Sequence, residues 1–263
     1  LVGVAVGVNL FMPFFGGFLG IISGLTPTIS QLYGAGRQDK IGFIVKQGFY
    51  WAFGLAVLFL AMGWLTVPWV LPLLALEPKV EYISRYYLLA VSFGIIPIFL
   101  AGVLRNFIDA HGYTRLTMGI TMCTVPVNIV LNYIFMYGLI GVPAFGGVGA
   151  GIGSALALTL NLVLNALVVT HIQPFRDYRL FHQLPRLNLA EWKKQLSIGI
   201  PIGGTMFCEQ SIFGAVGLFM TAYGTAIVAA HQAAMNFTTM VYMVPMAVSM
   251  ALTILVGYEV GAK

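Results

Sequence analysis

The sequence predicts an all-α, polytopic transmembrane helical bundle, and three observations lead to this fold class. Hydrophobic residues make up 59% of the 263 residues and charged residues 8%, whereas soluble domains usually carry about a quarter charged residues. The apolar residues form runs that are long enough for helices to cross a bilayer, which takes about 20 residues each. The loops between these runs alternate sharply in basic residues, as expected when cytoplasmic loops are positively charged.

Seven spans are predicted, at residues 5–34, 47–74, 83–104, 116–138, 147–170, 196–222 and 227–257. The first and the last are longer than a bilayer requires, so we expect tilt, a kink or an extension beyond the membrane. Five prolines lie inside spans or at their ends, and each favours a bend because it lacks a backbone N–H. They are Pro27, Pro97, Pro126, Pro201 and Pro245.

The basic residues predict which loops are cytoplasmic. One set of alternate loops, together with the chain end, holds Arg37, Lys40, Lys46, Arg105, Arg115, Arg176, Arg179, Arg186, Lys193, Lys194 and Lys263. The other set holds only Lys79 and Arg85. Because basic loops stay in the cytoplasm, Leu1 is predicted outside and Lys263 inside.

A polar segment at 171–195 is predicted to be a cytoplasmic linker between an amino-terminal lobe (1–170) and the start of a carboxy-terminal lobe (196–263). A short repeat supports this division, with residues recurring at an offset of 227: Asn9 and Asn236, Leu25-Thr26 and Leu252-Thr253, Gly34-Ala35 and Gly261-Ala262. Both copies run from outside to cytoplasm, so the repeat is predicted to be parallel, with its axis along the membrane normal. With six helices in a unit, we expect one helix before Leu1 and four after Lys263, making twelve in two lobes.

Glu209 is the one acidic residue that the sequence places inside an apolar span. A carboxylate at bilayer depth costs roughly 2.5–3.5 kcal/mol on insertion scales, so it needs a partner or a proton. We interpret Glu209 as a cation or proton site that faces a cavity. The alternative is a structural pair with a polar residue of a neighbouring helix. The other acidic residues are assigned to loops or span ends, with Asp109 in a cytoplasmic loop.

Several polar side chains accompany Glu209 in the spans. Asn128 and Asn132 are four residues apart and share one helical face, where they either line a polar cavity or bond to another helix. His231 is expected to be a hydrogen-bonded residue near the membrane interface rather than a proton relay. The residues expected in a substrate or cation cavity are Asn128, Asn132, Gln210, Gln232 and Asn236.

Other motifs point away from enzymes. The glycine-rich run at 146–153 is interpreted as small residues that let helices approach closely, because no strand precedes it as a nucleotide-binding loop requires. Cys123 and Cys208 lie in apolar runs and are expected to be small buried residues without a redox role. The sequence has no metal-type Cys/His spacing and no nucleophile motif, so no enzyme is expected. A channel stays an alternative, although no filter sequence is evident.

Four groups of residues together resemble the multidrug and toxic compound extrusion (MATE) family, and the resemblance covers essentially the whole chain. They are similar to the end of the family's second helix, the loop after its fourth, its fifth helix with the entry to the sixth, and its eighth helix. The segments are 24–37, 105–114, 128–138 with 146–151, and 229–232 with 236–237. The bacterial NorM-like branch looks nearest.

The resemblance implies twelve helices in two six-helix lobes, arranged as a V around a central cavity. It implies export of organic, often cationic drugs in exchange for sodium ions or protons. Glu209 matches the seventh-helix glutamate that serves cation coupling, with sodium the only metal ion expected there. Asn128 matches an amide near the cation site of the amino-terminal lobe, whereas Asn132 stands where some relatives carry an aspartate.

The resemblance implies no cofactor and no nucleic acid. The expected partners are drug-like small molecules and membrane lipids, and the protein is expected to be a monomer in the cell (inner) membrane. An exporter or flippase of lipid-linked saccharides, from the same superfamily, is the alternative function.

Overall fold

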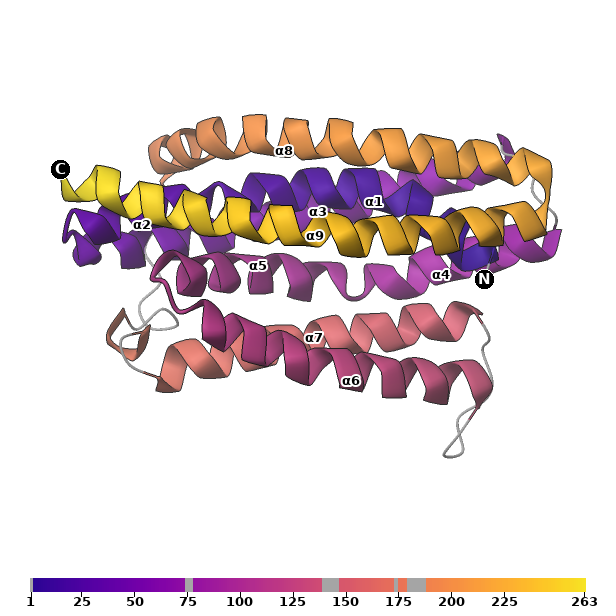
Figure 1. Ribbon diagram of the computed structural model, residues 1–263, viewed down its shortest axis with the longest axis horizontal. Coiled ribbons are helices and arrows are strands. Elements are labelled where there is room, and N and C mark those ends of the chain that lie inside the picture. The colour runs from indigo at the N-terminus through magenta and orange to yellow at the C-terminus, as the bar shows by residue number, and fades with distance from the viewer. Residues whose placement is uncertain (1, 74–77, 139–146, 173–174, 179–187) are drawn as a thin grey trace.

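The computed structural model describes residues 2–73, 78–138, 147–172, 175–178 and 188–263, and every secondary-structure element in these ranges is helical. The helices lie side by side in an elongated bundle (Figure 1). In chain order they are α1 (Val2–Ser23), α2 (Leu25–Gly34), α3 (Gln38–Leu73), α4 (Pro78–Ser92), α5 (Ile95–Ala110), α6 (Thr114–Tyr137), α7 (Gly147–His171), the 3₁₀ helix η1 (Phe175–Tyr178), α8 (Leu189–Phe219), the 3₁₀ helix η2 (Met220–Tyr223) and α9 (Thr225–Ala262).

Six of the seven predicted spans meet a test of length and composition for crossing a membrane. Five pass as one span each, at Pro13–Gly34, Asp39–Thr66, Thr114–Tyr137, Val148–His171 and Thr225–Ala262. The sixth is the pair α4 and α5, which are bent by 50° at a short break. The seventh, α8, is not among the described segments that pass. Its 31 residues span about 46 Å, but Glu209, Gln210 and several glycines lower its hydropathy.

Two predicted spans are broken three residues before a proline. The span predicted at 5–34 is α1 followed by α2, with the break at Gly24, and α5 likewise follows α4 after Gly94. Pro27 and Pro97 are each the third residue of the second helix, so each leaves the carbonyl four residues earlier without a helical donor. The other three prolines lie inside continuous helices, where they cause no break: Pro126, Pro201 and Pro245.

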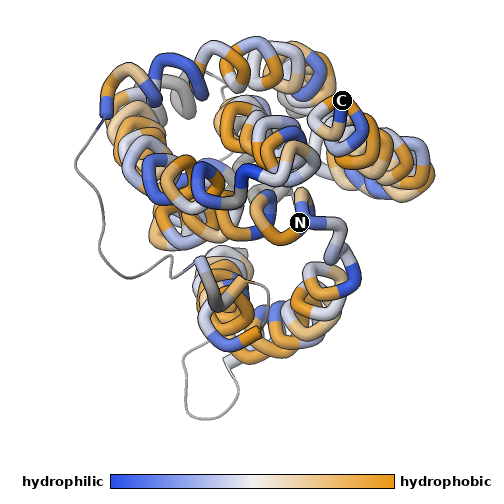
Figure 2. Tube along the Cα trace, turned by 90° about the vertical axis from the view of Figure 1, so that its left-hand side faces the viewer, coloured by the Kyte–Doolittle hydropathy of each residue, from blue (hydrophilic) through white to orange (hydrophobic). Residues whose placement is uncertain are grey.

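The core lies among α1, α2, α3 and α5, while α6 and α9 are largely exposed. Only 11% of the span residues of α6 and 6% of those of α9 are buried within the chain. Hydrophobic residues therefore lie on outward as well as inward faces of the helices (Figure 2). Such faces are unfavourable in water and suit lipid or further helices. The fully buried core side chains include Ile22, Leu25, Ile29, Phe99, Leu104 and Phe107.

Glycines bring α1 and α8 into the most extensive helix–helix interface of the described chain. A Cβ atom on Gly24 would lie 2.7 Å from the Cα of Gly199, and one on Gly20 would lie 2.9 Å from the Cα of Gly203. The two backbones are thus in direct contact, which is how small residues drive association in membranes.

The glycine-rich run serves the same purpose at the start of α7, as predicted. A Cβ atom on Gly151 would lie 2.9 Å from the carbonyl oxygen of Tyr87 on α4, and Gly149 and Gly153 pack equally closely against α6. By contrast, the prediction for the cysteines is wrong. Cys123 and Cys208 are both exposed, because an apolar run does not determine which of its faces turns outward.

The element ends that are predicted to be cytoplasmic gather at one end of the bundle. The end of α2, the α5–α6 turn, η1, the start of α8 and the C-terminus all lie at the left in Figure 1. Which side of the membrane this end occupies stays a prediction, as does the division into lobes. Helix α8 already begins at Leu189, inside the predicted linker. Outside the described residues lie Leu1, Leu74, Gly146, Arg179 and Arg186.

Candidate functional site

Glu209 lies partly buried on α8 and is hydrogen-bonded to α9. The hydroxyl of Tyr242 donates to Glu209 Oε1. The two helices are joined by η2 and Gly224, whose φ of 104° reverses the chain direction without a side-chain clash. As a result α9 runs back antiparallel to α8 (Figure 1), which brings Tyr242 opposite Glu209.

Tyr242 is a polar partner of the kind that the structural interpretation of Glu209 predicts, yet this bond leaves most of the acceptor positions of the carboxylate free. An ionised carboxylate has about four acceptor positions, and the Tyr242 hydroxyl occupies one of them. The remaining positions can hold a cation, a water molecule or, in the neutral form, a proton. A neutral Glu209 would also keep the bond, because a phenol can donate or accept.

The start of α8 is fixed on α3 by a reciprocal pair of tryptophans and glutamines. Trp51 Nε1 on α3 donates to Gln195 Oε1 at 2.5 Å, and Trp192 Nε1 on α8 donates to Gln47 Oε1 at 2.7 Å. Gln47, Trp51 and Gln195 are buried. These contacts anchor the start of α8, the helix that carries Glu209, and sequence patterns did not reveal them.

The other predicted cavity residues on α8 and α9 are not bonded to Glu209. Gln210 packs against α1, where its Cγ would lie 3.0 Å from a Cβ on Gly16. Gln232 Nε2 donates to Asn236 Oδ1 at 3.3 Å, within α9. His231, next to Gln232, is partly buried. Among the bonds between described residues, none joins Gln210, Gln232 or Asn236 to Glu209.

Asn128 and Asn132 form a second polar group, away from Glu209. Both lie on α6, and Asn132 packs against Gly153 of α7. Figures 1 and 2 show the α6–α7 pair on the side of the bundle opposite α8. The Oδ1 atoms of both side chains are buried without a hydrogen-bond partner. Since a buried unpaired acceptor costs free energy, each oxygen is a ready ligand for a water molecule or a cation.

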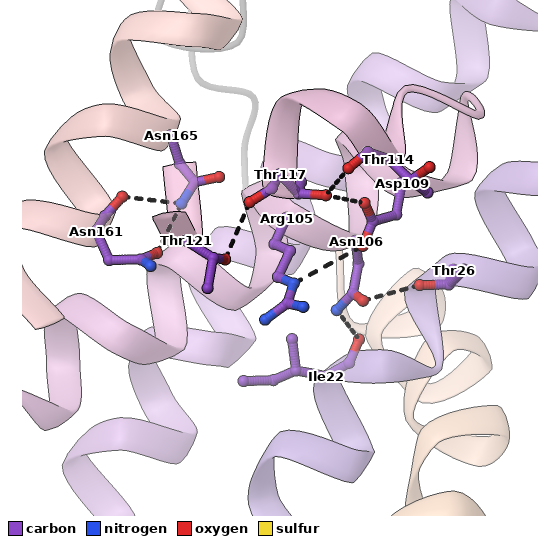
Figure 3. A network of polar contacts seen from close by, with 10 residues as sticks. All are labelled: Ile22, Thr26, Arg105, Asn106, Asp109, Thr114, Thr117, Thr121, Asn161 and Asn165. Atoms are coloured by element: carbon purple, nitrogen blue, oxygen red, sulfur yellow. Dashed lines mark hydrogen bonds and ion pairs between the residues drawn. The ribbon is translucent and has the colours of Figure 1, made fainter. Parts of the chain in front are cut away.

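Asp109 is not in a cytoplasmic loop, so that prediction is wrong. It is the penultimate residue of α5 and is buried. Thr117 of α6 donates to its Oδ1 at 2.7 Å, and Arg105 Nε lies 3.8 Å from its Oδ2. Figure 3 shows this group beside a second buried contact, in which Thr26 donates to Asn106 at 2.8 Å.

A buried histidine at the same end ties η1 to α5. His111 Nδ1 lies 2.8 Å from the carbonyl of Phe107, and its Nε2 lies 2.8 Å from the hydroxyl of Tyr178. Because a carbonyl only accepts, Nδ1 carries the proton and Nε2 accepts from the phenol. Burial lowers the pKa of His111 and raises the pKa of Tyr178 to about 12, so both groups are neutral and fit this arrangement.

Metal coordination by the usual side chains is not evident in the described part of the chain, where no three His, Cys, Asp or Glu side chains come together. A sodium ion would instead need carboxylate, amide and hydroxyl oxygens. Glu209 and the Asn128–Asn132 pair offer such oxygens in two separate places.

Comparison with known proteins agrees with this geometry. The MatE family profile matches residues 1–134 and 201–263. The probable multidrug resistance protein NorM of Oceanobacillus iheyensis is 43% identical over 263 residues, and its Bacillus subtilis counterpart is 44% identical over 262. Each match covers the whole of this chain. The chain spans only 59% and 58% of the lengths of these two relatives.

Solved structures agree on the fold. The MATE transporter NorM-NG, solved in a complex that includes a monobody, has a TM-score of 0.80 and is 26% identical in sequence. The match covers all of this chain and 57% of the NorM-NG chain. The eukaryotic MATE transporter AtDTX14 has a TM-score of 0.83 at 17% identity, covering 99% of this chain and 57% of its own. The second likeness concerns the fold alone.

Proposed function

The chain belongs to the MATE family, and from that membership we propose that the protein is a secondary transporter that exports organic, often cationic drugs in exchange for sodium ions or protons. It is a multi-pass membrane protein. The drugs, the coupling ion and the direction of transport are proposed, because the chain spans 59% of the length of the Oceanobacillus iheyensis relative.

One observation carries the proposal: Glu209 is a partly buried carboxylate on α8, and among the described residues its hydrogen-bond donor comes from the next helix. Glu209 bonds to Tyr242 across the α8–α9 hairpin. A buried carboxylate binds a proton or a cation in preference to standing bare. A site of this kind favours one cavity state when it is loaded and another when it is empty. That differential binding is what an exchange of ion against drug requires.

The amide pair on α6 is proposed as a second ion-binding or water-binding place, in the amino-terminal lobe. Asn128 and Asn132 present buried oxygen atoms that lack donors. Amide carbonyls suit hard cations such as sodium, and they also bind water well. Gln210, Gln232 and Asn236 are proposed to meet the drug rather than the ion, because none of them bonds to Glu209.

The decisive experiment replaces Glu209 in the full-length protein. Glu209→Gln keeps the size of the side chain and its ability to bond to Tyr242, but it removes the charge. We expect gradient-driven export of a fluorescent organic cation from cells to be abolished, with normal expression. Glu209→Asp should retain part of the activity, because the charge survives while its reach shortens.

Tyr242→Phe is the matched variant, since it removes the donor and leaves the carboxylate. This variant should raise severalfold the concentration of the coupling cation that gives half-maximal export. Collapsing the sodium and the proton gradients separately identifies the coupling ion. Full export by a well-expressed Glu209→Gln protein, with unchanged ion dependence, would falsify the proposal.

A further inference from the structure

The surroundings of Asp109 disfavour its charged form. Its side chain is 9% exposed, and it lies in the last turn of α5, where the unpaired carbonyls and the helix dipole repel an anion. The one charged side chain that pairs with it in the described chain is Arg105, at 3.8 Å and 55% exposed. An ion pair so exposed on one side offsets little of the cost of burial.

The hydroxyl of Thr117 lies between two acceptors in a way that suits a protonated carboxyl. Thr117 Oγ1 is 2.7 Å from Asp109 Oδ1 and 2.8 Å from the carbonyl of Thr114. A hydroxyl has one proton and can satisfy only one of the two acceptors at a time. If Asp109 is protonated, it donates to Thr117, which donates to Thr114, and every group is paired.

Neutral amide side chains of α7 lie next to this network, beyond the two threonines of α6. Figure 3 shows Asn161 and Asn165 of α7 on the far side of Thr117 and Thr121. Asn165 is 2% exposed, and its Oδ1 has no hydrogen-bond partner. The other titratable group nearby, His111, directs both ring nitrogens away, to Phe107 and Tyr178.

A polar face of α6 leads from Asp109 toward the amide pair. Its members are Thr117, Thr121, Thr124, Asn128 and Asn132. Their spacings of three and four residues place them on one side of the helix. The hydroxyls of Thr121 and Thr124 donate back to carbonyls of their own helix, which leaves the lone pairs of these two oxygens free to accept from water. Among the described residues, three buried amide oxygens lack a hydrogen-bond partner: those of Asn128 and Asn132 on this face and that of Asn165 on α7, beside Thr121.

We propose that Asp109 is a second proton-exchanging carboxyl of this transporter, on the cytoplasmic side, joined to the Asn128–Asn132 pair by a hydrated polar face of α6. Cytoplasmic water delivers a proton to an Asp109 oxygen, the new O–H bonds to Thr117, and the proton returns to water when the carboxylate re-forms. The site rests on the proposed transport function, and it makes export depend on cytoplasmic pH through a group other than Glu209.

Infrared difference spectra of the purified full-length protein at two pH values test the protonation directly. A protonated-carboxyl band should be lost in Asp109→Asn and retained in Glu209→Gln. Thr117→Val keeps the carboxyl but removes its hydroxyl partner, so it should shift the band. Asp39→Asn is the control, because Asp39 is an exposed carboxylate at the start of α3, at the same end of the bundle.

Export assays separate this idea from the proposed function. In proteoliposomes, Asp109→Asn should bind a fluorescent organic cation normally but lose the dependence of export on cytoplasmic pH, and Asp109→Glu should restore it. If Glu209→Gln loses export while Asp109→Asn keeps the pH dependence of the original protein, the proposed function stands and the assignment of Asp109 fails. An unchanged infrared band in both Asp109→Asn and Thr117→Val, or an unchanged pH profile in Asp109→Asn, overturns the assignment of Asp109.

Discussion

Glu209 and Asp109 both carry the free-energy cost of removing a carboxylate from water, and different neighbours offset that cost. Each is a carboxylate that is at least partly buried between helices, and each is hydrogen-bonded to a hydroxyl on the following helix, that of Tyr242 and that of Thr117 respectively. Glu209 has no basic side chain paired with it in the described chain, whereas Asp109 has Arg105 at 3.8 Å. Under the proposed function a proton or an incoming cation balances the charge of the first carboxylate, whereas Arg105 balances the charge of the second only weakly.

His111 makes the attachment of η1 sensitive to pH. Burial lowers its pKa below the ordinary value of 6.5, so the unfolded or undocked chain takes up a proton more readily than the docked one. The stabilisation is complete above 6.5 and is lost as the pH falls through that value toward the lower pKa of the docked state. Hydrogen–deuterium exchange at the amides of Phe175–Tyr178, corrected for intrinsic rates, should therefore be faster at about pH 5.5 than at about pH 7.5.

His111→Gln provides the control for this effect, since glutamine can bond to Phe107 and Tyr178 but does not titrate. Its exchange in η1 should be the same at both pH values. Equal pH dependence in the variant and the original protein would show that another group is responsible.

At the residue scale, sequence reasoning could find Glu209 but not Asp109. A lone acidic residue in a long apolar run stands out, because the cost of placing it at bilayer depth is large. Asp109 stands beside Arg105, His111 and Gly112, which look like a solvated loop. Its burial results from α6 and α7 packing over it, and a single sequence carries little signal for such a contact.

At the scale of elements, the existence of the helices could be predicted while their ends could not. Apolar runs indicate where a helix crosses the membrane, but α3 and α8 both begin earlier, at Gln38 and Leu189. Asn188 caps the N-terminus of α8, because its Oδ1 accepts the backbone N–H of Glu191 at 3.1 Å. A hydropathy pattern does not detect a first helical turn made of polar residues, so the predicted helix starts are too late.

Two adjacent glycines on α8 test the contact between α1 and α8. A Cβ on Gly203 would lie 2.6 Å from the carbonyl oxygen of Gly17, whereas one on Gly204 would meet nothing within 4 Å. Gly203→Ala should therefore destabilise the protein by about 1–3 kcal/mol through overpacking. Gly204→Ala should be neutral or stabilising by roughly 0.5–1 kcal/mol, the usual gain in a helix.

Thermal unfolding of the full-length protein in detergent measures both variants side by side. The comparison controls for helix propensity and for side-chain volume, since the same change is made at neighbouring positions. Equal melting temperatures for the two variants would mean that the backbones of α1 and α8 are not in contact at Gly203.

At the scale of the whole molecule, the two predicted repeat copies run in the same direction. The α1–α2 pair and α9 both end at the same end of the bundle (Figure 1), as a parallel repeat requires. The superposition of 9–35 on 236–262 stays a prediction. The copies differ locally, because α1 and α2 are broken at Gly24 while α9 is continuous. A short repeat could predict the direction, but not the break, which Pro27 imposes on one copy only.

The C-terminal ends of α2 and α9, which are predicted to be cytoplasmic, form a glycine-lined contact. This contact would have to open for the proposed cavity to face the cytoplasm. Ser30 Oγ on α2 donates to the carbonyl of Ile254 on α9 at 2.5 Å. Gly34, Gly257 and Gly261 allow the two backbones to approach closely in the same place. A transporter that alternates between two states needs such a contact in one state and not in the other.

A reversible cross-link across this contact should therefore stop export. A Cβ on Gly257 would lie 3.1 Å from the Cβ of Ser30, close to the 3.5–4.5 Å or so that disulfides span. The exposed Cys123 and Cys208 are first replaced by serine in the full-length protein, and Ser30→Cys is then combined with Gly257→Cys. Oxidation should join α2 to α9 and abolish export, and reduction should restore it, whereas each single cysteine variant should export at the same rate under both conditions. Undiminished export by a quantitatively cross-linked protein would rule out opening at this contact, because the bond would have fixed the two helices together throughout the transport cycle.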